Sequence, residues 1–368
     1  MKIAVLSSHT PSLMCFRLDM MLSFCKLGHD VVAIGNEPEN EWTEKFSAYG
    51  IKYRQVEVQR NGTNPIKDIK TLSSIKKVLK EEKPDKLFTY QAKTIVYGGI
   101  AARILKISEV YPLIAGVGSV FLSNGFKIRM IRAILTVQYK IAMKRSPNVF
   151  FQNTDDLDVF VNNKIIKREK AVIINGSGVN LDKFTEKSLP EKFAFLFIGR
   201  LIRDKGIIEY LEAAAKVKEK HPDVRFLLVG PFDTNPTAIK KEDLQIYTDK
   251  GIVEYFGEQS DVRSYLEECS VFVLPSYREG TPKTILEAMA TRRAIITTDA
   301  TGCRETVAQG VNGYLVPVKD VNALAEKMES LINDPEAVVR MATEGRRLVE
   351  TKYDVNLVNQ TIIDTMNI

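Results

Sequence analysis

The sequence predicts an α/β protein of two doubly wound domains that face each other across a deep cleft. Short apolar segments alternate with amphipathic helical segments along the whole chain, which is typical of parallel sheets covered on both faces. The alternation pauses at the polar segment 176–187, which carries two glycines, and then restarts. At 368 residues the chain is long enough for two such domains.

The first domain is assigned to residues 1–178. Apolar runs predict its strands, and apolar residues at helical spacing predict the helices between them. The predicted strands are 2–7, 29–35, 52–58, 86–91, 111–116, 148–153 and 171–175, and the helices are 16–25, 66–82, 95–105, 126–144 and 154–161.

The second domain is assigned to residues 179–352 by the same reasoning. Its predicted strands are 193–198, 224–229, 252–256, 271–275, 294–298 and 313–316, and its helices are 204–220, 262–269, 282–290, 321–332 and 336–352. The helical pattern of about 353–368 is expected to pack back on the first domain.

Composition narrows the class of protein. A hydrophobic content of 45% and a charged content of 27% are ordinary for a soluble globular chain. No run of eighteen apolar residues is present, and the N-terminal apolar run is too short for a signal peptide. The four cysteines lack metal-site spacing and only three histidines occur. We therefore expect free thiols, no metal and a cytoplasmic protein.

Charge is unevenly distributed. Residues 1–185 hold 28 lysines and arginines against 17 acidic residues, and no acidic residue lies between Glu109 and Asp155. The predicted helix within that window is basic and amphipathic, which favours either contact with an anionic membrane surface or core packing with a solvated basic face. Nucleic acid is not expected, since no aromatic stacking pattern accompanies the charge. The candidate membrane-contacting cations are Lys127, Arg129, Arg132, Lys140 and Lys144.

Glu279 and Glu287 lie eight residues apart around a predicted helix start, with Thr281 as the expected cap and Pro282 as the expected first helical residue. A helix N-terminus with free N–H groups suits a phosphate or diphosphate, so a carboxylate would lie on each side of an anion site. The plainer interpretation is that the acids only complement the helix dipole. A glycosidase pair fits poorly, because it needs carboxyl groups roughly 5–9.5 Å apart, whereas eight helical residues span about 12 Å.

A second anion site is predicted where strand 193–198 ends. Gly199 and Arg200 follow that strand, and Lys205 stands at the start of the next helix. Two cations at a helix N-terminus can bind a phosphate group, although an exposed turn often carries such residues without a ligand. Both predicted sites follow strand ends of one domain, so we expect them to close on one diphosphate.

Three segments, GRLIRDKG, PSYREGTPKTILEAMA and GVNGYLVP, resemble the corresponding motifs of retaining GT-B glycosyltransferases of family 4, whose fold pairs two Rossmann-like domains. The likeness covers nearly the whole chain. The GVGSVFLSNGF segment resembles enzymes that build bacterial capsule, O-antigen and protein-linked glycans on undecaprenyl carriers, including N-acetylhexosaminyl transferases.

The resemblance implies roles for individual residues. Arg200 and Lys205 would neutralise the donor diphosphate, Glu279 would contact the donor sugar, and Glu287 would accept hydrogen bonds from the ribose. Backbone N–H groups near Lys283 and Thr284 would hold phosphate oxygens, beside the donor-site residues Gly199, Thr281 and Pro282.

On the acceptor side, His9, Gly116, Gly118 and Ser119 are expected to lie on loops that face the cleft. Many relatives carry a histidine, threonine or acid after the fifth strand, where this chain has Ala115 and Gly116. A general base for the acceptor hydroxyl is therefore not assigned. This agrees with the front-face mechanism usually proposed for the family, in which the leaving phosphate takes the proton.

Together these observations predict a metal-independent retaining glycosyltransferase without a cofactor, bound peripherally to the inner face of the bacterial cytoplasmic membrane. It would move a sugar, N-acetylhexosamine by resemblance, from a UDP-sugar to a lipid-linked saccharide. The alternatives are a sugar-nucleotide 2-epimerase of the same fold, and a non-catalytic partner in a membrane glycan assembly complex.

Overall fold

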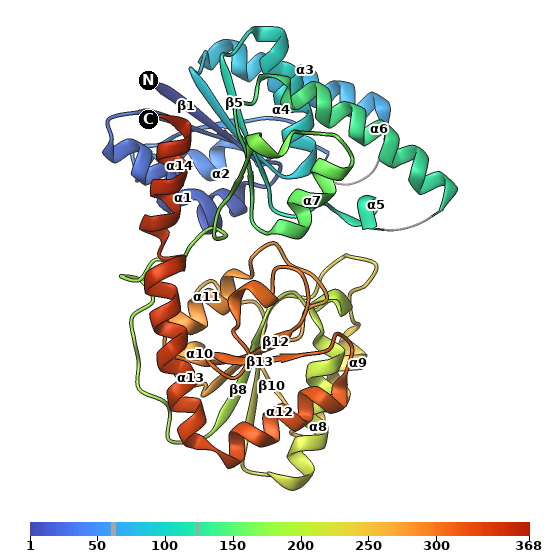
Figure 1. Cartoon of the computed structure of the whole chain (residues 1–368), viewed down its shortest axis with the longest axis vertical. Coiled ribbons are helices and arrows are strands. Elements are labelled where there is room, and N and C mark those ends of the chain that lie inside the picture. Colours follow the sequence, from blue (N-terminus) through green and yellow to red (C-terminus); the bar gives the residue numbers. More distant parts are fainter. Residues whose placement is uncertain (60–63, 123–124) are drawn as a thin grey trace. The chain divides into compact units, whose positions relative to one another are not determined.

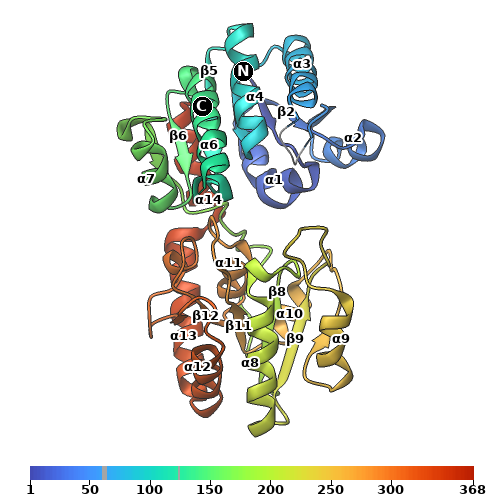
Figure 2. The same ribbon diagram turned by 90° about the vertical axis from the view of Figure 1, so that its right-hand side faces the viewer.

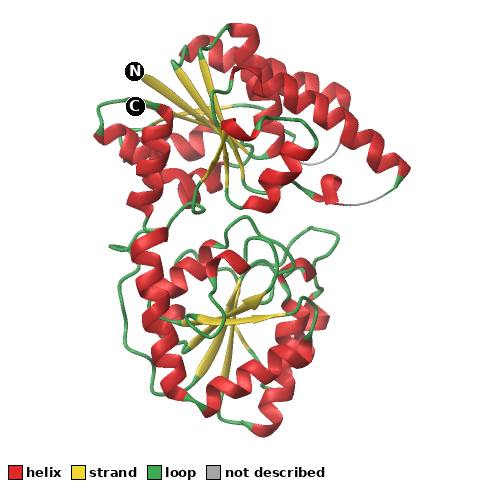
Figure 3. Ribbon diagram, viewed as in Figure 1, coloured by secondary structure: helices red, strands yellow, loops and turns green. Residues whose placement is uncertain are grey.

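The structure, a computed structural model, describes residues 1–59, 64–122 and 125–368. The chain forms two compact units: Met1–Ser177 with Val358–Ile368, and Gly178–Leu357. In each unit, strands form a parallel sheet that is covered by helices on both faces (Figure 3). The prediction of an α/β protein with two doubly wound domains is confirmed.

The sheet of the first unit has the strand order β3-β2-β1-β4-β5-β6-β7. After β1 the chain builds β2 and β3 outward on one side, and it then returns to place β4 on the other side of β1. Ligands of doubly wound sheets bind where the order reverses, beyond the carboxyl ends of the strands. In this sheet, that point lies between β1 and β4. The strands are β1 Lys2–Leu6, β2 Asp30–Gly35, β3 Lys52–Gln55, β4 Lys86–Tyr90, β5 Glu109–Ile114, β6 Val149–Phe151 and β7 Ala171–Ile173.

Two apolar cores flank this sheet, because successive strand residues point to opposite faces. Ile3 and Val5 of β1 belong to a core that includes residues of α1, α2 and α14. Ala4 and Leu6 belong to the other core, which includes residues of α3, α4, α6 and α7. The helices are α1 Thr10–Lys26, α2 Glu39–Ser47, α3 Pro65–Glu82, α4 Ala92–Leu105, α5 Ser119–Leu122, α6 Phe126–Ala142, α7 Thr154–Asn162 and α14 Val355–Met366 (Figure 1).

The C-terminal helix α14 packs on the first unit. Its residues Val358, Ile362 and Met366 are buried in the core beneath α1. The backbone carbonyl of Met366 also accepts a hydrogen bond from the Lys86 Nζ at 2.5 Å. Apolar burial and a charged hydrogen bond therefore hold the end of the chain on this sheet.

The sheet of the second unit has the order β10-β9-β8-β11-β12-β13. Its order reverses between β8 and β11, so the loops that follow these two strands emerge side by side. The strands are β8 Ala194–Ile198, β9 Arg225–Val229, β10 Glu254–Tyr255, β11 Val271–Leu274, β12 Ala294–Thr298 and β13 Gly313–Val316. The helices are α8 Ile207–Lys220, α9 Lys241–Asp249, α10 Arg263–Glu267, α11 Lys283–Ala290, α12 Val321–Asn333 and α13 Pro335–Leu348 (Figure 2).

Each predicted strand overlaps an observed one in the described part of the chain, but some helix predictions were wrong. Helix α11 begins at Lys283 and its N-cap residue is Pro282, so Thr281 is not the cap. Helices α2 and α9 were not predicted; each is nine residues long and fully buries one side chain, Phe46 or Leu244. Within the described residues, no helix combines the length and apolar character needed to cross a bilayer.

Candidate functional site

The candidate site of the second unit lies on the loops that follow β8 and β11. These loops are packed backbone to backbone at Gly206, which has a φ of +75°. A Cβ atom at this position would lie 2.1 Å from the carbonyl oxygen of Pro275, so only glycine fits. The backbone N–H of Tyr277 also donates to the carbonyl of Asp204 at 2.9 Å. The loop that carries Lys205 is therefore fixed against the loop that carries Glu279.

Lys205 and Glu279 form an ion pair across these two loops, through Nζ and Oε1. Their side chains are 23% and 12% exposed, so both groups are largely shielded but still reach solvent. The backbone of Glu279 is held from the other side, where its N–H donates to the carbonyl of Thr301 at 2.9 Å. The sequence predicted both residues for the donor site, and the structure brings them into contact.

Gly302 fixes the Glu279 loop more tightly. It has a φ of +82°, and an added Cβ atom would lie 2.3 Å from the carbonyl oxygen of Glu279. The loop after β12 therefore supports the loop after β11 through a contact that no side chain tolerates. The loops after three neighbouring strands of the sheet, β8, β11 and β12, thus position Glu279.

Arg200 contacts a carboxylate on the loop after β9. Its Nη1 donates to the Oδ2 of Asp233, on the loop after β9, at 2.8 Å, and its side chain is half-exposed. Burial acts to raise the pKa of Asp233, but hydrogen bonds from Arg200 and the backbone N–H of Asn235 outweigh it, and this pKa lies below its usual range. The Arg200 guanidinium is thus paired with the Asp233 carboxylate.

Glu287 lies on the second turn of α11 and is buried, with the Lys283 Nζ at 3.7 Å from its Oε1. Burial raises the pKa of this carboxyl, although the nearby Lys283 and Lys183 act to lower it. The backbone N–H groups of Lys283 and Thr284 belong to the first turn of α11, where helices present N–H groups toward the helix start. A carboxylate, a cation and a helix N-terminus thus lie together on this element.

The first unit has a polar cluster where its strand order reverses. His9, just before α1, pairs through Nδ1 with the Oε1 of Glu37 at 3.1 Å, and the other carboxylate oxygen accepts from the backbone N–H of Thr10 at 2.6 Å. The Glu37 carboxylate therefore complements the N-terminus of α1 and orients the imidazole. Burial acts to raise the pKa of Glu37, but the hydrogen bonds from Thr10 and His9 lower it overall.

Sequence reasoning missed Glu37 and Asp233. Each follows the carboxyl end of a strand, β2 or β9, and an acid at that place is a usable signal. Gln91 was also missed. It is the N-cap residue of α4 and has a φ of +73°, and its side-chain oxygen accepts from the backbone N–H of Ser8 at 2.9 Å. A non-glycine residue at positive φ is uncommon, and such residues often lie at functional sites.

The remaining predicted acceptor-side residues follow β5. Gly116 and Gly118 lie in the loop after this strand, and Ser119 begins α5, although its side chain lies outside the described residues. Part of the segment 116–126, residues 123–124, lies outside the description as well.

Helix α6 carries the basic residues that were predicted to contact a membrane. Lys127, Arg129 and Lys140 are exposed, and Lys144 lies in the turn just after the helix. The Nε of Arg132 instead donates to the carbonyl of Val120 at 3.0 Å, which ties α6 to α5. The helix also exposes apolar residues on one face: Phe126, Met130, Ile134, Val137 and Ile141. Core packing with a purely basic outer face does not describe this helix.

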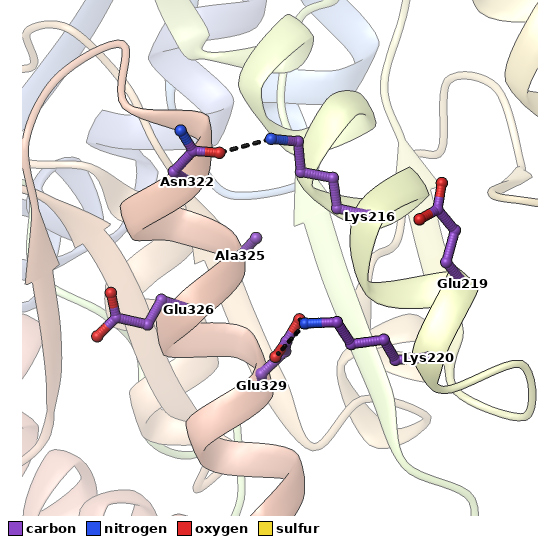
Figure 4. A pocket seen from close by; sticks show the side chains of 7 residues that line it. All are labelled: Lys216, Glu219, Lys220, Asn322, Ala325, Glu326 and Glu329. Atoms are coloured by element: carbon purple, nitrogen blue, oxygen red, sulfur yellow. Dashed lines mark hydrogen bonds and ion pairs between the residues drawn. The ribbon is translucent and has the colours of Figure 1, made fainter.

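A polar hollow of about 370 Å³ lies between α8 and α12 (Figure 4). Its cations are paired, since Lys220 contacts Glu329 at 2.9 Å and Lys216 contacts Asn322. The lining residues come from the C-terminal half of α8, far along that helix from the β8 loop. Among the described residues, no group of three or more His, Cys, Asp or Glu side chains is placed to hold a metal ion.

Two doubly wound parallel-sheet units, with paired cations, carboxylates and a helix N-terminus at strand ends of the second, define the protein as a GT-B glycosyltransferase. Residues 180–348 match the family profile described as glycosyl transferases group 1, and residues 2–153 match the one described as glycosyl transferase 4-like. The chain belongs to this glycosyltransferase family.

Two curated relatives illustrate the similarity. The N,N'-diacetylbacillosaminyl-diphospho-undecaprenol alpha-1,3-N-acetylgalactosaminyltransferase of Campylobacter jejuni is 30% identical over 374 residues, which cover 98% of this chain and 96% of the relative. The UDP-Gal:alpha-D-GlcNAc-diphosphoundecaprenol alpha-1,3-galactosyltransferase of Escherichia coli is 28% identical over 283 residues, covering 73% of this chain and 72% of the relative.

Solved structures share the fold at lower identity. Sucrose-phosphate synthase from Thermosynechococcus elongatus superposes with a TM-score of 0.81 at 18% identity, covering 100% of this chain and 98% of that one. HepE from Anabaena, in complex with UDP, superposes with a TM-score of 0.78 at 18% identity and covers both chains completely. These likenesses support the fold assignment.

Proposed function

We propose that the protein is a retaining glycosyltransferase that moves an N-acetylhexosamine from a UDP-sugar to a lipid-linked saccharide during bacterial surface-glycan or protein-glycan assembly. The observation that carries this proposal is the contact between Lys205 and Glu279 at the strand-order reversal of the second unit. It joins a phosphate-binding cation to a sugar-binding carboxylate on two fixed loops.

The second unit, residues 179–352 with the turn that follows, is proposed to bind the donor. Arg200, Lys205 and the first turn of α11 would hold the diphosphate, because cations and helix N–H groups stabilise phosphate oxygens. Glu279 would accept hydrogen bonds from the sugar hydroxyls, and Glu287 from the ribose. Gly199, Thr281 and Pro282 would shape the backbone around the phosphates.

The proposed mechanism of sugar transfer follows from the charges that develop on the donor. Cleavage of the anomeric C–O bond leaves its electron pair on UDP and positive charge on the sugar. Preorganised cations on the diphosphate stabilise the leaving group without reorganisation, which is typically the largest catalytic contribution. The acceptor hydroxyl attacks the face that UDP leaves, and its proton passes to the departing phosphate oxygen. These reaction steps require no protein base and no metal, and they retain the anomeric configuration.

The first unit is proposed to bind the acceptor. His9 would contact an acceptor hydroxyl through Nε2, because Glu37 engages Nδ1. Gly116, Gly118 and Ser119 would line the same side of the acceptor site. The names of the two curated relatives support a saccharide carried on diphosphoundecaprenol, and one of them supports an N-acetylhexosamine as the transferred sugar. The UDP complex of HepE supports the nucleotide.

Helix α6 is proposed to hold the enzyme on the inner face of the cytoplasmic membrane. Its exposed cations, Lys127, Arg129 and Lys140, would contact anionic headgroups while its exposed apolar face enters the interface. Each basic residue near such a surface contributes about 1 kcal/mol. Flotation with vesicles that contain anionic lipid tests this step, and binding that is insensitive to salt would contradict the electrostatic part.

A panel of UDP-sugars with and without a diphosphoundecaprenol-linked saccharide tests the proposed reaction. We expect a glycosylated lipid only when both substrates are present. Release of free epimerised sugar from the donor alone would support the alternative assignment as a sugar-nucleotide 2-epimerase. A protein that binds UDP but forms no product would support the assignment as a non-catalytic partner in a glycan assembly complex.

A further inference from the structure

An apolar groove lies among α3, α4 and α6 of the first unit, on the face of the sheet opposite α1 and α14. Helix α4 packs between α3 and α6 (Figure 2). The groove has a volume of about 650 Å³, which falls within the range of ligand pockets. Its lining residues are Pro65, Asp68, Ile69, Leu72, Ala92, Lys93, Val96, Tyr97, Ile131, Ile134, Leu135 and Gln138.

The chemistry of the lining favours a hydrocarbon occupant. Most of the lining side chains are aliphatic, and the two charged ones neutralise each other, since the Lys93 Nζ contacts the Asp68 Oδ1 at 2.7 Å. A saccharide or phosphate would find few unpaired partners here, and burial of polar groups without partners is costly. An extended aliphatic chain needs no such partners and gains from contact with this wall.

The groove is continuous with the exposed apolar face of α6. Ile134 belongs to both, being 56% exposed and also part of the groove lining. Lys127 is exposed and lies one turn before the lining residue Ile131, on the same side of α6. A ligand with a hydrocarbon chain and an anionic diphosphate matches both the apolar lining and this cation.

We infer that this groove binds a segment of the isoprenoid chain of the acceptor lipid, next to its diphosphate. The inference rests on the proposed function, which supplies a lipid-linked acceptor, and it adds the site at which the lipid itself is recognised. A groove of this volume holds a short segment of a long polyprenol, and the rest of the chain stays in the bilayer. Recognition of chain length and chain shape is the expected consequence.

The substitution Ala92→Trp tests the inference because it fills the groove from an exposed position at the start of α4 and leaves the apolar face of α6 intact. The matched control is Ala48→Trp, at an exposed alanine that follows α2 on the other face of the sheet. Transfer is measured with the same saccharide diphosphate on undecaprenol and on ethanol, whose two carbons are too short to occupy the groove. We expect the wild-type protein and the control to prefer the long chain, with a lower KM.

For Ala92→Trp we expect the KM for the long-chain acceptor to rise about tenfold, while kcat/KM for the short-chain acceptor stays within twofold. Vesicle flotation should be unchanged. An unchanged preference for the long chain would overturn the inference, and so would equal losses with both acceptors.

A second measurement does not depend on turnover. Geranylgeranyl diphosphate that carries a diazirine on its terminal isoprene is photolysed with the wild-type protein in detergent. Labelled peptides should come from α3, α4 and α6, and Ala92→Trp should reduce the labelling. Labelling elsewhere would overturn the inference. Labelling of the groove by a protein that transfers no sugar would instead contradict the proposed function alone.

Discussion

The substitution Lys205→Met removes a charge at the proposed donor site and keeps the length and apolar stem of the side chain. Lys205 contacts Glu279 on a loop that three strand ends hold in place, so neither group relaxes easily to replace the lost contact. The change therefore removes a preorganised cation from the leaving diphosphate and leaves a largely shielded carboxylate without its counter-charge.

The expected loss of activity follows from the role of one preorganised charge. Removal of a single such donor typically costs about 10²–10³ in turnover, or roughly 2.7–4 kcal/mol of transition-state stabilisation. Stability should fall as well, by about 1–3 kcal/mol, because a shielded charged group loses its partner. Lys205 thus has two roles, and a second substitution separates them.

In the double variant Lys205→Met with Glu279→Gln, the carboxylate is neutral and no longer needs the cation. The free energy of unfolding should recover toward the wild-type value, whereas UDP affinity should stay weak. Initial rates of transfer, calorimetric titration with UDP and urea denaturation measure the three quantities. The control is Lys220→Met, which breaks the exposed pair with Glu329 in the hollow of Figure 4. It should change stability by less than about 1 kcal/mol and leave transfer unchanged.

The reasoning is refuted if Lys205→Met retains kcat/KM and UDP affinity within threefold of the wild type. It is also refuted if the double variant regains UDP affinity together with stability. In that case Lys205 would serve only as the structural partner of Glu279.

Three further predictions concern other residues of the two candidate sites. Glu287→Gln should raise the melting temperature of the ligand-free protein at neutral pH and weaken UDP binding. Burial raises the pKa of this carboxyl in the folded state, so its ionisation opposes folding above that pKa, and the difference from wild type should shrink as the pH falls toward the unfolded value of 4.5; a constant difference across this range would contradict the assignment. Gly302→Ala should lower the free energy of unfolding by about 1–3 kcal/mol, since its Cβ atom would meet the carbonyl oxygen of Glu279, and an unchanged urea midpoint would argue against this packing. Glu37→Gln should raise the KM for the acceptor about tenfold, the effect of one charged hydrogen bond, because the imidazole of His9 loses its orientation; an equal loss of UDP affinity would show a general structural defect instead.

Much of the fold was predictable because buried parallel strands are continuous apolar runs. The run VFVLPS, for example, predicted β11. The short helices were not predictable in this way. Helix α2 fully buries only Phe46, and helix α9 only Leu244, so each has a single short apolar pair rather than a repeated period.

The residues of the donor site were predictable from local motifs, but their partners were not. Glu279 and Lys205 each follow a strand end, and the strand order that brings them together is a property of the doubly wound sheet. The pairing of Arg200 with Asp233 joins loops after β8 and β9, and no local pattern specifies it. His9 and Glu37 are separated in the chain by α1 and β2, so their contact depends on the parallel pairing of β1 with β2.

The most direct test of the central claim is the anomeric configuration of the transferred sugar in the product. The protein is incubated with UDP-N-acetylhexosamine and a diphosphoundecaprenol-linked saccharide, and the new linkage is examined by the one-bond carbon–proton coupling at its anomeric carbon. The account predicts a new glycosidic bond with the configuration of the donor. A product of inverted configuration would contradict the front-face mechanism, and free sugar without transfer would contradict the assignment as a glycosyltransferase of lipid-linked acceptors.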